Sequence, residues 1–225
     1  TSSCFYTTLV RDSQRHKPFT PNRMTDNNQD GLIKSTFVTQ THGYIDVSLK
    51  QDMWQKVAND FKGIFKVSHN SGNELEMLSL AIPYKHWVIK LSESDTKPLK
   101  FEIDFTCLLD YELVLGPEDS IDKLLKKFGK KEIEIGNTAF DSQYLIDSKD
   151  HHNTTQIFTA EIVEYLLKHN VYSISYSTNL KKRTSHLISV VNRVTADRNS
   201  MDDLIHLYMK IIDRLEVLKI VDSKG

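Results

Sequence analysis

The sequence predicts an α+β fold in which about four helices pack on a mainly antiparallel sheet. From Ile33 onward, the spacing of apolar residues changes repeatedly between the period of a strand and the period of a helix. The strand-like segments follow one another as in hairpins instead of alternating strictly with helices, which disfavours a doubly wound nucleotide-binding fold. In the clearest strand, residues 99–105, apolar and charged side chains alternate, so one face of the sheet is expected to be wet.

The first 32 residues are expected to form a poorly ordered arm, and residues 33–225 a single domain. Residues 11–31 hold two prolines and many polar residues with few apolar groups, which cannot offset the entropy cost of ordering the chain. Cys4 follows small residues, as at the processing site of bacterial lipoproteins, although an ordinary free cysteine is the favoured interpretation. Two localisations stay open: the cytoplasm, or attachment to a membrane through an upstream segment.

The remaining elements follow from weaker patterns. Seven further alternations, bounded by Gly, Pro, Asn, Asp or Ser, predict strands at residues 43–49, 64–68, 76–82, 84–91, 111–115, 171–177 and 187–194. Four helices are predicted, at about residues 52–62, 120–128, 159–170 and 201–218. Asp52 can cap the first helix and Gly63 can end it. The last helix has apolar residues at i, i+3 and i+4 along its length, so it must lie across a sheet or a partner.

Composition excludes several classes of function. Lys and Arg number 29 and Asp and Glu number 30, so the net charge of -1 gives no long-range attraction for nucleic acid, and no nucleic-acid partner is expected. Two cysteines cannot form a disulfide framework or a zinc site by themselves. No apolar run reaches the roughly 18 residues that a membrane-spanning helix needs. The chain has no glycine-rich nucleotide loop, nucleophile elbow or zinc-protease motif, so no cofactor and no catalytic residue is predicted.

The most basic point of the chain is the Lys-Lys-Arg segment at residues 181–183, between two predicted strands. Two interpretations stay open. With Tyr172 and Tyr176 nearby, the segment could form a hairpin that contacts phosphate. The favoured interpretation is a charged turn that keeps a corner of the sheet soluble.

Residues 133–148, IEIGNTAFDSQYLIDS, form the most informative pattern of the chain. Two short apolar alternations flank Gly136 and Asn137, which can adopt the left-handed backbone of a tight turn. Phe140 can fill the core, and Asp141 can cap the backbone amides that follow it. We interpret these four residues as structural. The alternative is that Asp141 lines a pocket.

This stretch resembles a segment of uncharacterised bacterial α+β domains, some of them attached to membrane segments. Residues 133–144 match their pattern I-x-I-G-[DN]-x-x-F-D-x-x-[FY]. In that family a polar loop and a leucine-rich helix follow, and here the helix would be residues 158–169. The resemblance covers about 40 residues of 225. It implies a fold and no established activity.

Two functions from different classes are consistent with the sequence. The favoured one is a non-catalytic interaction or scaffold domain that binds a protein partner through a sheet face or through the C-terminal helix. The alternative is a hydrolase-like or ligand-binding protein whose site is assembled from Asp141, His151, His152 and Tyr176. Asp147, Asp150, His151 and His152 fall within six residues and could supply ligands to a divalent ion. A metal ion there is disfavoured because adjacent histidines in a polar loop point apart and no second cluster completes the set, so no metal ligand is predicted.

Overall fold

The computed structural model describes residues 48–69, 76–94, 96–117, 133–191 and 197–223, and the structural statements below concern these residues. Every described residue belongs to one compact unit, residues 44–225. The predicted arm and its boundary at residue 32 therefore lie outside the described residues and stay predictions.

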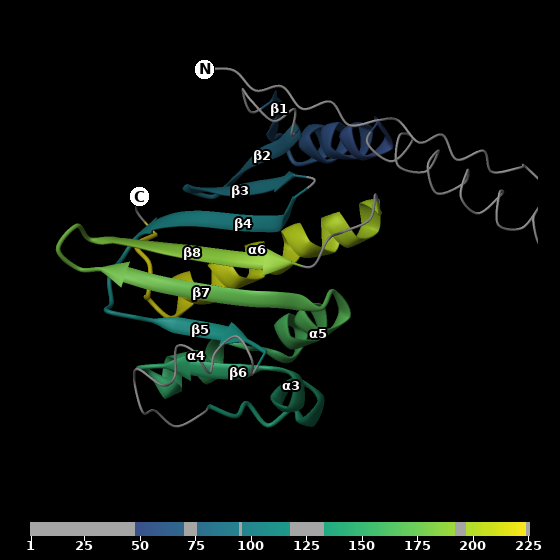
Figure 1. Ribbon diagram of the computed structural model, residues 1–225. Helices are drawn as coiled ribbons and strands as arrows, with labels where there is room; N and C mark the ends of the chain where they lie inside the picture. Colours follow the sequence, from purple (N-terminus) through teal and green to yellow (C-terminus); the bar gives the residue numbers. More distant parts are fainter. Residues whose placement is uncertain (1–47, 70–75, 95, 118–132, 192–196, 224–225) are drawn as a thin grey trace, which may run out of the picture. The chain divides into compact units, whose positions relative to one another are not determined.

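Eight strands form one sheet, in which every neighbouring pair is antiparallel (Figure 1). In chain order they are β1 (Ile64–His69), β2 (Glu76–Tyr84), β3 (Trp87–Ser94), β4 (Lys97–Thr106), β5 (Leu113–Gly116), β6 (Leu145–Ser148), β7 (Val171–Asn179) and β8 (Thr184–Val191). Their order across the sheet is β1-β2-β3-β4-β8-β7-β5-β6, so the late hairpin β7–β8 lies between β4 and β5. The predicted α+β class and antiparallel pairing are confirmed.

Five described helices accompany the sheet. They are a helix over residues 48–60, α3 (Thr138–Gln143), α4 (His151–Ile157), α5 (Ala160–Lys168) and the long C-terminal α6 (Arg198–Val217). Thr159 caps α5 and Asp197 caps α6, each by accepting hydrogen bonds from backbone amides of the first turn. Two predicted helices are thus confirmed near their expected bounds. The predicted helix at about 120–128 lies outside the described residues.

The first described helix differs from its prediction at both ends. It is already helical at residue 48, so Asp52 lies inside it and the end of the predicted strand 43–49 is helical. A short alternation is a weak signal for a strand. Extending an existing helix by one turn costs little free energy, so the helix prevails over the predicted strand here. The left-handed residue that ends the helix is Lys62, with φ 53°, and not Gly63. Gly63 is needed for another reason, because a Cβ there would lie 2.8 Å from the carbonyl oxygen of Ala81 on β2.

The predicted strand at residues 84–91 is divided by a turn. Tyr84 ends β2, Lys85 has a left-handed backbone with φ 53°, and β3 begins at Trp87. The pairing of Tyr84 with Trp87 closes this tight hairpin. The predicted strand at residues 84–91 is therefore wrong at its start, because the apolar pattern alone does not reveal the turn.

The helices cover one face of the sheet. On this face a single row of cross-strand neighbours runs through all eight strands, and only one member is polar. The row consists of Phe65, Leu80, Leu91, Phe101, Ser189, Ile174, Leu115 and Ile146. Figure 1 shows α6 passing behind the central strands, where the ring of Tyr208 stacks on Phe101 with centroids 4.1 Å apart. The helix over residues 48–60 covers the β1 end of the row through Trp54, whose ring lies 6.0 Å from that of Phe65.

The apolar side of α6 belongs to the core. Ile205 and Ile212 are both 0% exposed. At the start of α6, Arg198 forms an ion pair of 2.6 Å with Asp60, which joins α6 to the end of the neighbouring helix. The expectation that the C-terminal helix could offer its apolar stripe to a partner is therefore wrong, because the sheet and the neighbouring helices already cover that stripe. None of the helices in the described ranges is both long and apolar enough to span a bilayer.

Candidate functional site

The motif at residues 133–144 builds a structural corner. Asn137 caps α3 by accepting a hydrogen bond of 3.1 Å from the amide of Phe140, whose side chain is fully buried. Gly136 has φ 83°, as expected for a left-handed turn. Asp141 accepts hydrogen bonds of 3.0 Å from the amides of Ile135 and Gly136. The expectation that Asp141 caps the amides after it is wrong, since Asp141 lies within α3 and its carboxylate reaches back to the preceding turn.

The residues of the hydrolase-like alternative are not brought together. Tyr176 is buried in the core, where its hydroxyl lies 2.6 Å from the hydroxyl of Ser185. Burial raises the pKa of Tyr176 above its ordinary value. His151 and His152 are exposed in the first turn of α4, and Asp141 is engaged in the corner at α3. Throughout the described part of the chain, no group of three or more His, Cys, Asp or Glu residues is arranged to hold a metal ion.

The opposite surface of the sheet is the candidate site. A second row of cross-strand neighbours runs through all eight strands there and mixes apolar, small and charged residues. It consists of Ile64, Ala81, Lys90, Glu102, Ile188, Ser175, Val114 and Asp147. None of the described helices lies on this surface, which we call the open face (Figure 1). The wet face predicted from the alternation in residues 99–105 is confirmed, because Lys100, Glu102 and Asp104 all lie on it.

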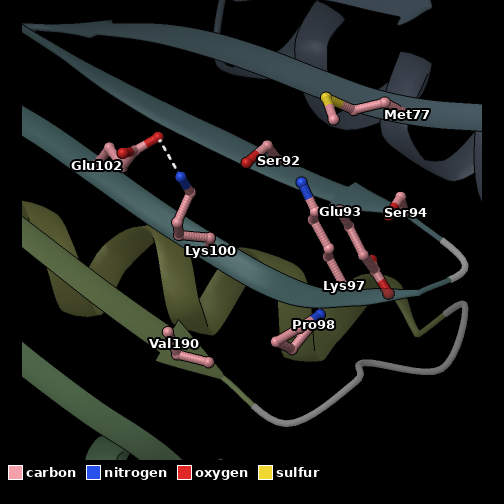
Figure 2. Close-up of a pocket in the computed structure, with 9 residues that line it drawn as sticks. All are labelled: Met77, Ser92, Glu93, Ser94, Lys97, Pro98, Lys100, Glu102 and Val190. Carbon is pink, nitrogen blue, oxygen red and sulfur yellow. Dashed lines mark ion pairs between the residues drawn. The ribbon is translucent and has the colours of Figure 1, made fainter. Parts of the chain in front are cut away.

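A hollow of about 470 Å³ opens in the open face over β2, β3, β4 and β8, a volume in the range of small binding sites. Its apolar lining comes from Met77, Pro98 and Val190, and Figure 2 shows Met77 and Val190 on opposite sides of it. Lys97 and Lys100 add two ammonium groups to the lining. Lys100 pairs with Glu102 at 2.9 Å, whereas Lys97 forms no ion pair with any described residue. The hollow thus combines an apolar interior with at least one cation that no described carboxylate neutralises.

The hollow lies at an irregularity of the sheet. The register between β3 and β4 shifts between Ser92 and Ser94. Ser92 pairs with Lys100 and Ser94 with Lys97, so two residues of β4, Pro98 and Leu99, lie opposite the single residue Glu93 of β3, and the bulge is on β4. Glu93 is only 2% exposed, and its carboxylate lies 2.5 Å from the ammonium of Lys50 on the helix over residues 48–60. Glu93 follows the regular alternation of β3 and lies on the helix side of the sheet, whereas Ser92 and Ser94 lie at the hollow.

Charged groups near the other end of the open face form a network. Asp104 lies 2.8 Å from the ammonium of Lys90 and 2.6 Å from Nδ1 of His186. The hydrogen bond from Lys90, and then that from His186, lowers the pKa of Asp104 below its ordinary value. A second hollow of about 370 Å³, lined by polar residues, adjoins Asp104 and His186. These groups are largely in contact with solvent, so the network fixes side-chain positions more than it stabilises the fold.

The row Asp104, His186 and Ser177 runs across three adjacent strands and has the residue types of a hydrolytic triad. Its geometry is different. His186 places Nδ1 on Asp104, but its Nε2 lies 3.7 Å from a carboxylate oxygen of Glu102. A histidine held between two carboxylates has no nitrogen directed at a serine as base. The arrangement is an ion-pair network.

Sequence reasoning identified the wet face of β4 but not the hollow. The hollow joins residues of strands that are distant in sequence, so no local pattern reveals it. One signal for the bulge was available: Pro98 interrupts the start of the strand that follows, and proline within a sheet is found at edges, at strand starts and at bulges. The charged network could not be predicted from the sequence, because Asp104 and His186 are 82 positions apart.

No protein-family model matches the chain, and the comparison with curated proteins gives no match. Among solved structures, the chain is similar to the crystal structure of the mycobacterial trehalose monomycolate transport factor A, with a TM-score of 0.49 and 8% sequence identity. The similarity covers 77% of this chain and 98% of that chain. A similarity of this degree carries no argument about fold or function, and the resemblance of residues 133–144 to bacterial α+β domains stays a prediction.

Proposed function

We propose that this chain is a non-catalytic interaction domain that binds a partner protein through the open face of its sheet. The observation that carries the proposal is the hollow over β2, β3, β4 and β8, with its apolar interior and the cation of Lys97. Such a hollow suits a segment of a partner that inserts an apolar side chain and places a carboxylate beside it.

Two further features support binding by a protein and not chemistry on a substrate. Several ionisable groups of the open face are engaged in ion pairs with one another, as between Lys90 and Asp104, and the imidazole of His186 is directed at carboxylates and not at a serine. Apolar side chains are interspersed among these charges, with Val88 41% exposed beside the network. A mixed surface of this kind is typical of an interface between proteins that associate reversibly.

Site-specific photo-crosslinking in the organism that makes the protein tests the proposal. A photoreactive phenylalanine analogue at Ser94, beside the hollow, is expected to give a discrete crosslinked partner. The same analogue at Glu164, exposed on α5 on the opposite side of the sheet, is the control and should give none. Crosslinking that is equal at the two positions, or absent at Ser94, would contradict the proposal.

The same assay tests the chemistry of the hollow. Val190→Asp places a charge in its apolar interior and Lys97→Glu reverses its free cation, so each should weaken crosslinking at Ser94 by about ten-fold. Lys56→Glu, a matched change on an exposed helical position, should leave crosslinking unchanged. Circular dichroism of the purified variants shows whether each still folds.

A further inference from the structure

We infer that the end of the β7–β8 hairpin is a site that binds the surface of an anionic lipid bilayer. The site consists of residues 180–183, Leu-Lys-Lys-Arg, which we call the basic tip, together with the neighbouring Leu108 and Leu109. This inference does not depend on the partner proposed for the open face, because it uses a different surface of the domain.

The basic tip is an ordered turn that projects from the sheet. The amide of Lys182 donates to the carbonyl of Asn179 at 3.1 Å, and the amide of Arg183 donates to the carbonyl of Leu180 at 3.2 Å. Arg183 completes the turn with φ 54°. Figure 1 shows the hairpin extending past the ends of β4 and β5. A turn whose backbone is already ordered adds no cost of backbone ordering on binding.

Exposed leucines lie on this end of the sheet. Leu180 is 53% exposed at the basic tip, and Leu108 and Leu109 are 49% and 37% exposed in the loop after β4. That loop is joined to the basic tip by a hydrogen bond of 3.1 Å from the amide of Cys107 to the carbonyl of Arg183. Three large apolar side chains are therefore exposed to water around one turn. Exposed apolar surface is unfavourable in water, and a cluster of this kind is typical of a binding surface.

The cations of the basic tip are available to a negative surface. Lys181, Lys182 and Arg183 are all exposed, and none forms an ion pair with another described residue. Of the described segments that hydrogen bonds join to this end, residues 107–110 and 219–222 carry two carboxylates, Asp110 and Asp222, against the three cations of the basic tip and Lys219. Because the whole chain has a net charge of -1, this positive end is local and gives the domain a preferred orientation on an anionic surface.

The combination favours lipid over nucleic acid. A bilayer interface offers anionic headgroups to cations and, just below them, an apolar layer to leucines. Single-stranded nucleic acid is held by aromatic side chains on which bases stack, and the basic tip has none. The two tyrosines considered in the sequence do not supply them, since Tyr176 is buried in the core and Tyr172 lies at the opposite end of β7.

Vesicle flotation of the full chain tests the inference. The protein should float with vesicles of phosphatidylcholine and phosphatidylglycerol at low salt, and not with phosphatidylcholine alone. Each basic residue near an anionic surface raises binding about five-fold, so Lys181→Glu with Lys182→Glu should weaken it more than about twenty-fold. The matched control, Lys56→Glu with Lys66→Glu, makes the same change of charge at exposed positions on the first described helix and β1 and should retain binding.

Fluorescence tests whether the apolar residues enter the bilayer. In Leu180→Trp, the new indole should shift to the blue on vesicles and be quenched by lipids with brominated acyl chains, while the native Trp54 and Trp87 stay buried. Val88→Trp on the open face is the control and should not be quenched. Quenching of Val88→Trp but not of Leu180→Trp would overturn the inference.

Three other results would also overturn it. These are no flotation of the parent protein with anionic vesicles, equal flotation with neutral vesicles, and equal loss in the control charge variant. Binding of a labelled single-stranded RNA without flotation would assign the basic tip to nucleic acid instead.

Discussion

Ser189 is the only polar residue in the apolar row beneath the helices, and its surroundings explain how it is tolerated. Its hydroxyl accepts a hydrogen bond of 2.5 Å from the hydroxyl of Tyr208 and donates one of 2.7 Å to the carbonyl of Ser173. Burial raises the pKa of Tyr208, so this hydroxyl keeps its proton. Both hydroxyls at this contact between α6 and β8 therefore have hydrogen-bond partners.

Removing the hydroxyl of Ser189 and removing that of Tyr208 should have unequal effects on stability. Ser189→Ala leaves the buried hydroxyl of Tyr208 without an acceptor and should lower the free energy of unfolding by about 1–3 kcal/mol. Tyr208→Phe removes the donor but leaves Ser189 bonded to Ser173, so its cost should be smaller, about 0.5–1.5 kcal/mol. Urea unfolding of the two variants measures both values. A larger loss of unfolding free energy in Tyr208→Phe than in Ser189→Ala would show that these hydrogen bonds are not organised as described.

Lys62 and Gly63 allow a second test at the scale of single residues. Lys62→Gly should stabilise the protein by up to about 1 kcal/mol, because a lysine with φ 53° carries a backbone strain that glycine does not. Gly63→Ala should destabilise it, because the new Cβ would meet the carbonyl oxygen of Ala81, a backbone atom that cannot move aside easily. Thermal unfolding compares the two. If Gly63→Ala leaves the unfolding temperature unchanged, this turn does not approach β2 as closely as described.

Sequence reasoning at this scale identified the right residue types but not always their geometry. Gly136 and Phe140 take the structural roles expected of them, because a left-handed turn and a core aromatic have strong local preferences. Asn137 was expected in the left-handed turn, but its backbone is extended with φ -105° and its side chain caps α3. The direction of the Asp141 carboxylate depended on α3, which the sequence did not reveal. Lys62 was missed because the preference of the left-handed region for glycine favoured its neighbour.

Among the elements, the long periodic ones were predictable and the short ones were not. The twenty residues of α6 repeat the helical period many times, so its existence and its buried side followed from the pattern. In contrast, α3 buries only Phe140, and α4 buries only Thr154 and Ile157. One or two buried positions do not define a helical period, so the sequence pattern did not predict either helix.

The start of α6 gives a pH-dependent prediction at the scale of the element. The carboxylate of Asp197 accepts hydrogen bonds from Ser200, both from its hydroxyl and its backbone amide, and from the amide of Asn199. These interactions, led by the Ser200 hydroxyl, lower the pKa of Asp197 from its ordinary value of 3.8. A lowered pKa in the folded state means that the carboxylate stabilises the protein above about pH 4, and that this contribution is lost as the pH falls through the lowered value.

Asp197→Asn separates the charge from the cap. Asparagine caps helices about as well as aspartate, so at neutral pH the variant should be less stable by only about 0.5 kcal/mol, the contribution of a charge at a helix N-terminus. Urea unfolding at several values between about pH 7 and pH 3 should show this difference shrinking toward zero with acid. A difference that stays constant over the range would show that the charge of Asp197 plays no part.

At the scale of the whole molecule, the sequence indicated that the sheet has one wet face but not which strands compose it. Strand order decides this: β8 lies beside β4 only because the late hairpin enters the middle of the sheet. No local pattern encodes that insertion, so neither the hollow beside Val190 nor the pairing of His186 with Asp104 could be predicted. The basic tip was visible as a sequence of cations, but the exposed leucines around it became apparent only when the loop after β4 was placed beside it.

The contrast between the two faces of the sheet predicts a contrast in stability that two adjacent residues of β4 can measure. Phe101 belongs to the covered row beneath Tyr208, and Glu102 belongs to the open face. Phe101→Ala should lower the free energy of unfolding by about 3–5 kcal/mol, because it leaves a cavity under α6. Glu102→Ala removes a partly exposed ion pair with Lys100 and should change it by less than about 1 kcal/mol.

The comparison also bears on the proposed function, since a free binding surface must tolerate substitution in the absence of its partner. Urea unfolding of both variants in the purified protein gives the two values under identical conditions. A small effect in Glu102→Ala, combined with weaker crosslinking at Ser94, would separate binding from folding on the same strand. If Glu102→Ala is instead as destabilising as Phe101→Ala, then the open face is covered in the isolated protein, and the hollow cannot be where a partner binds.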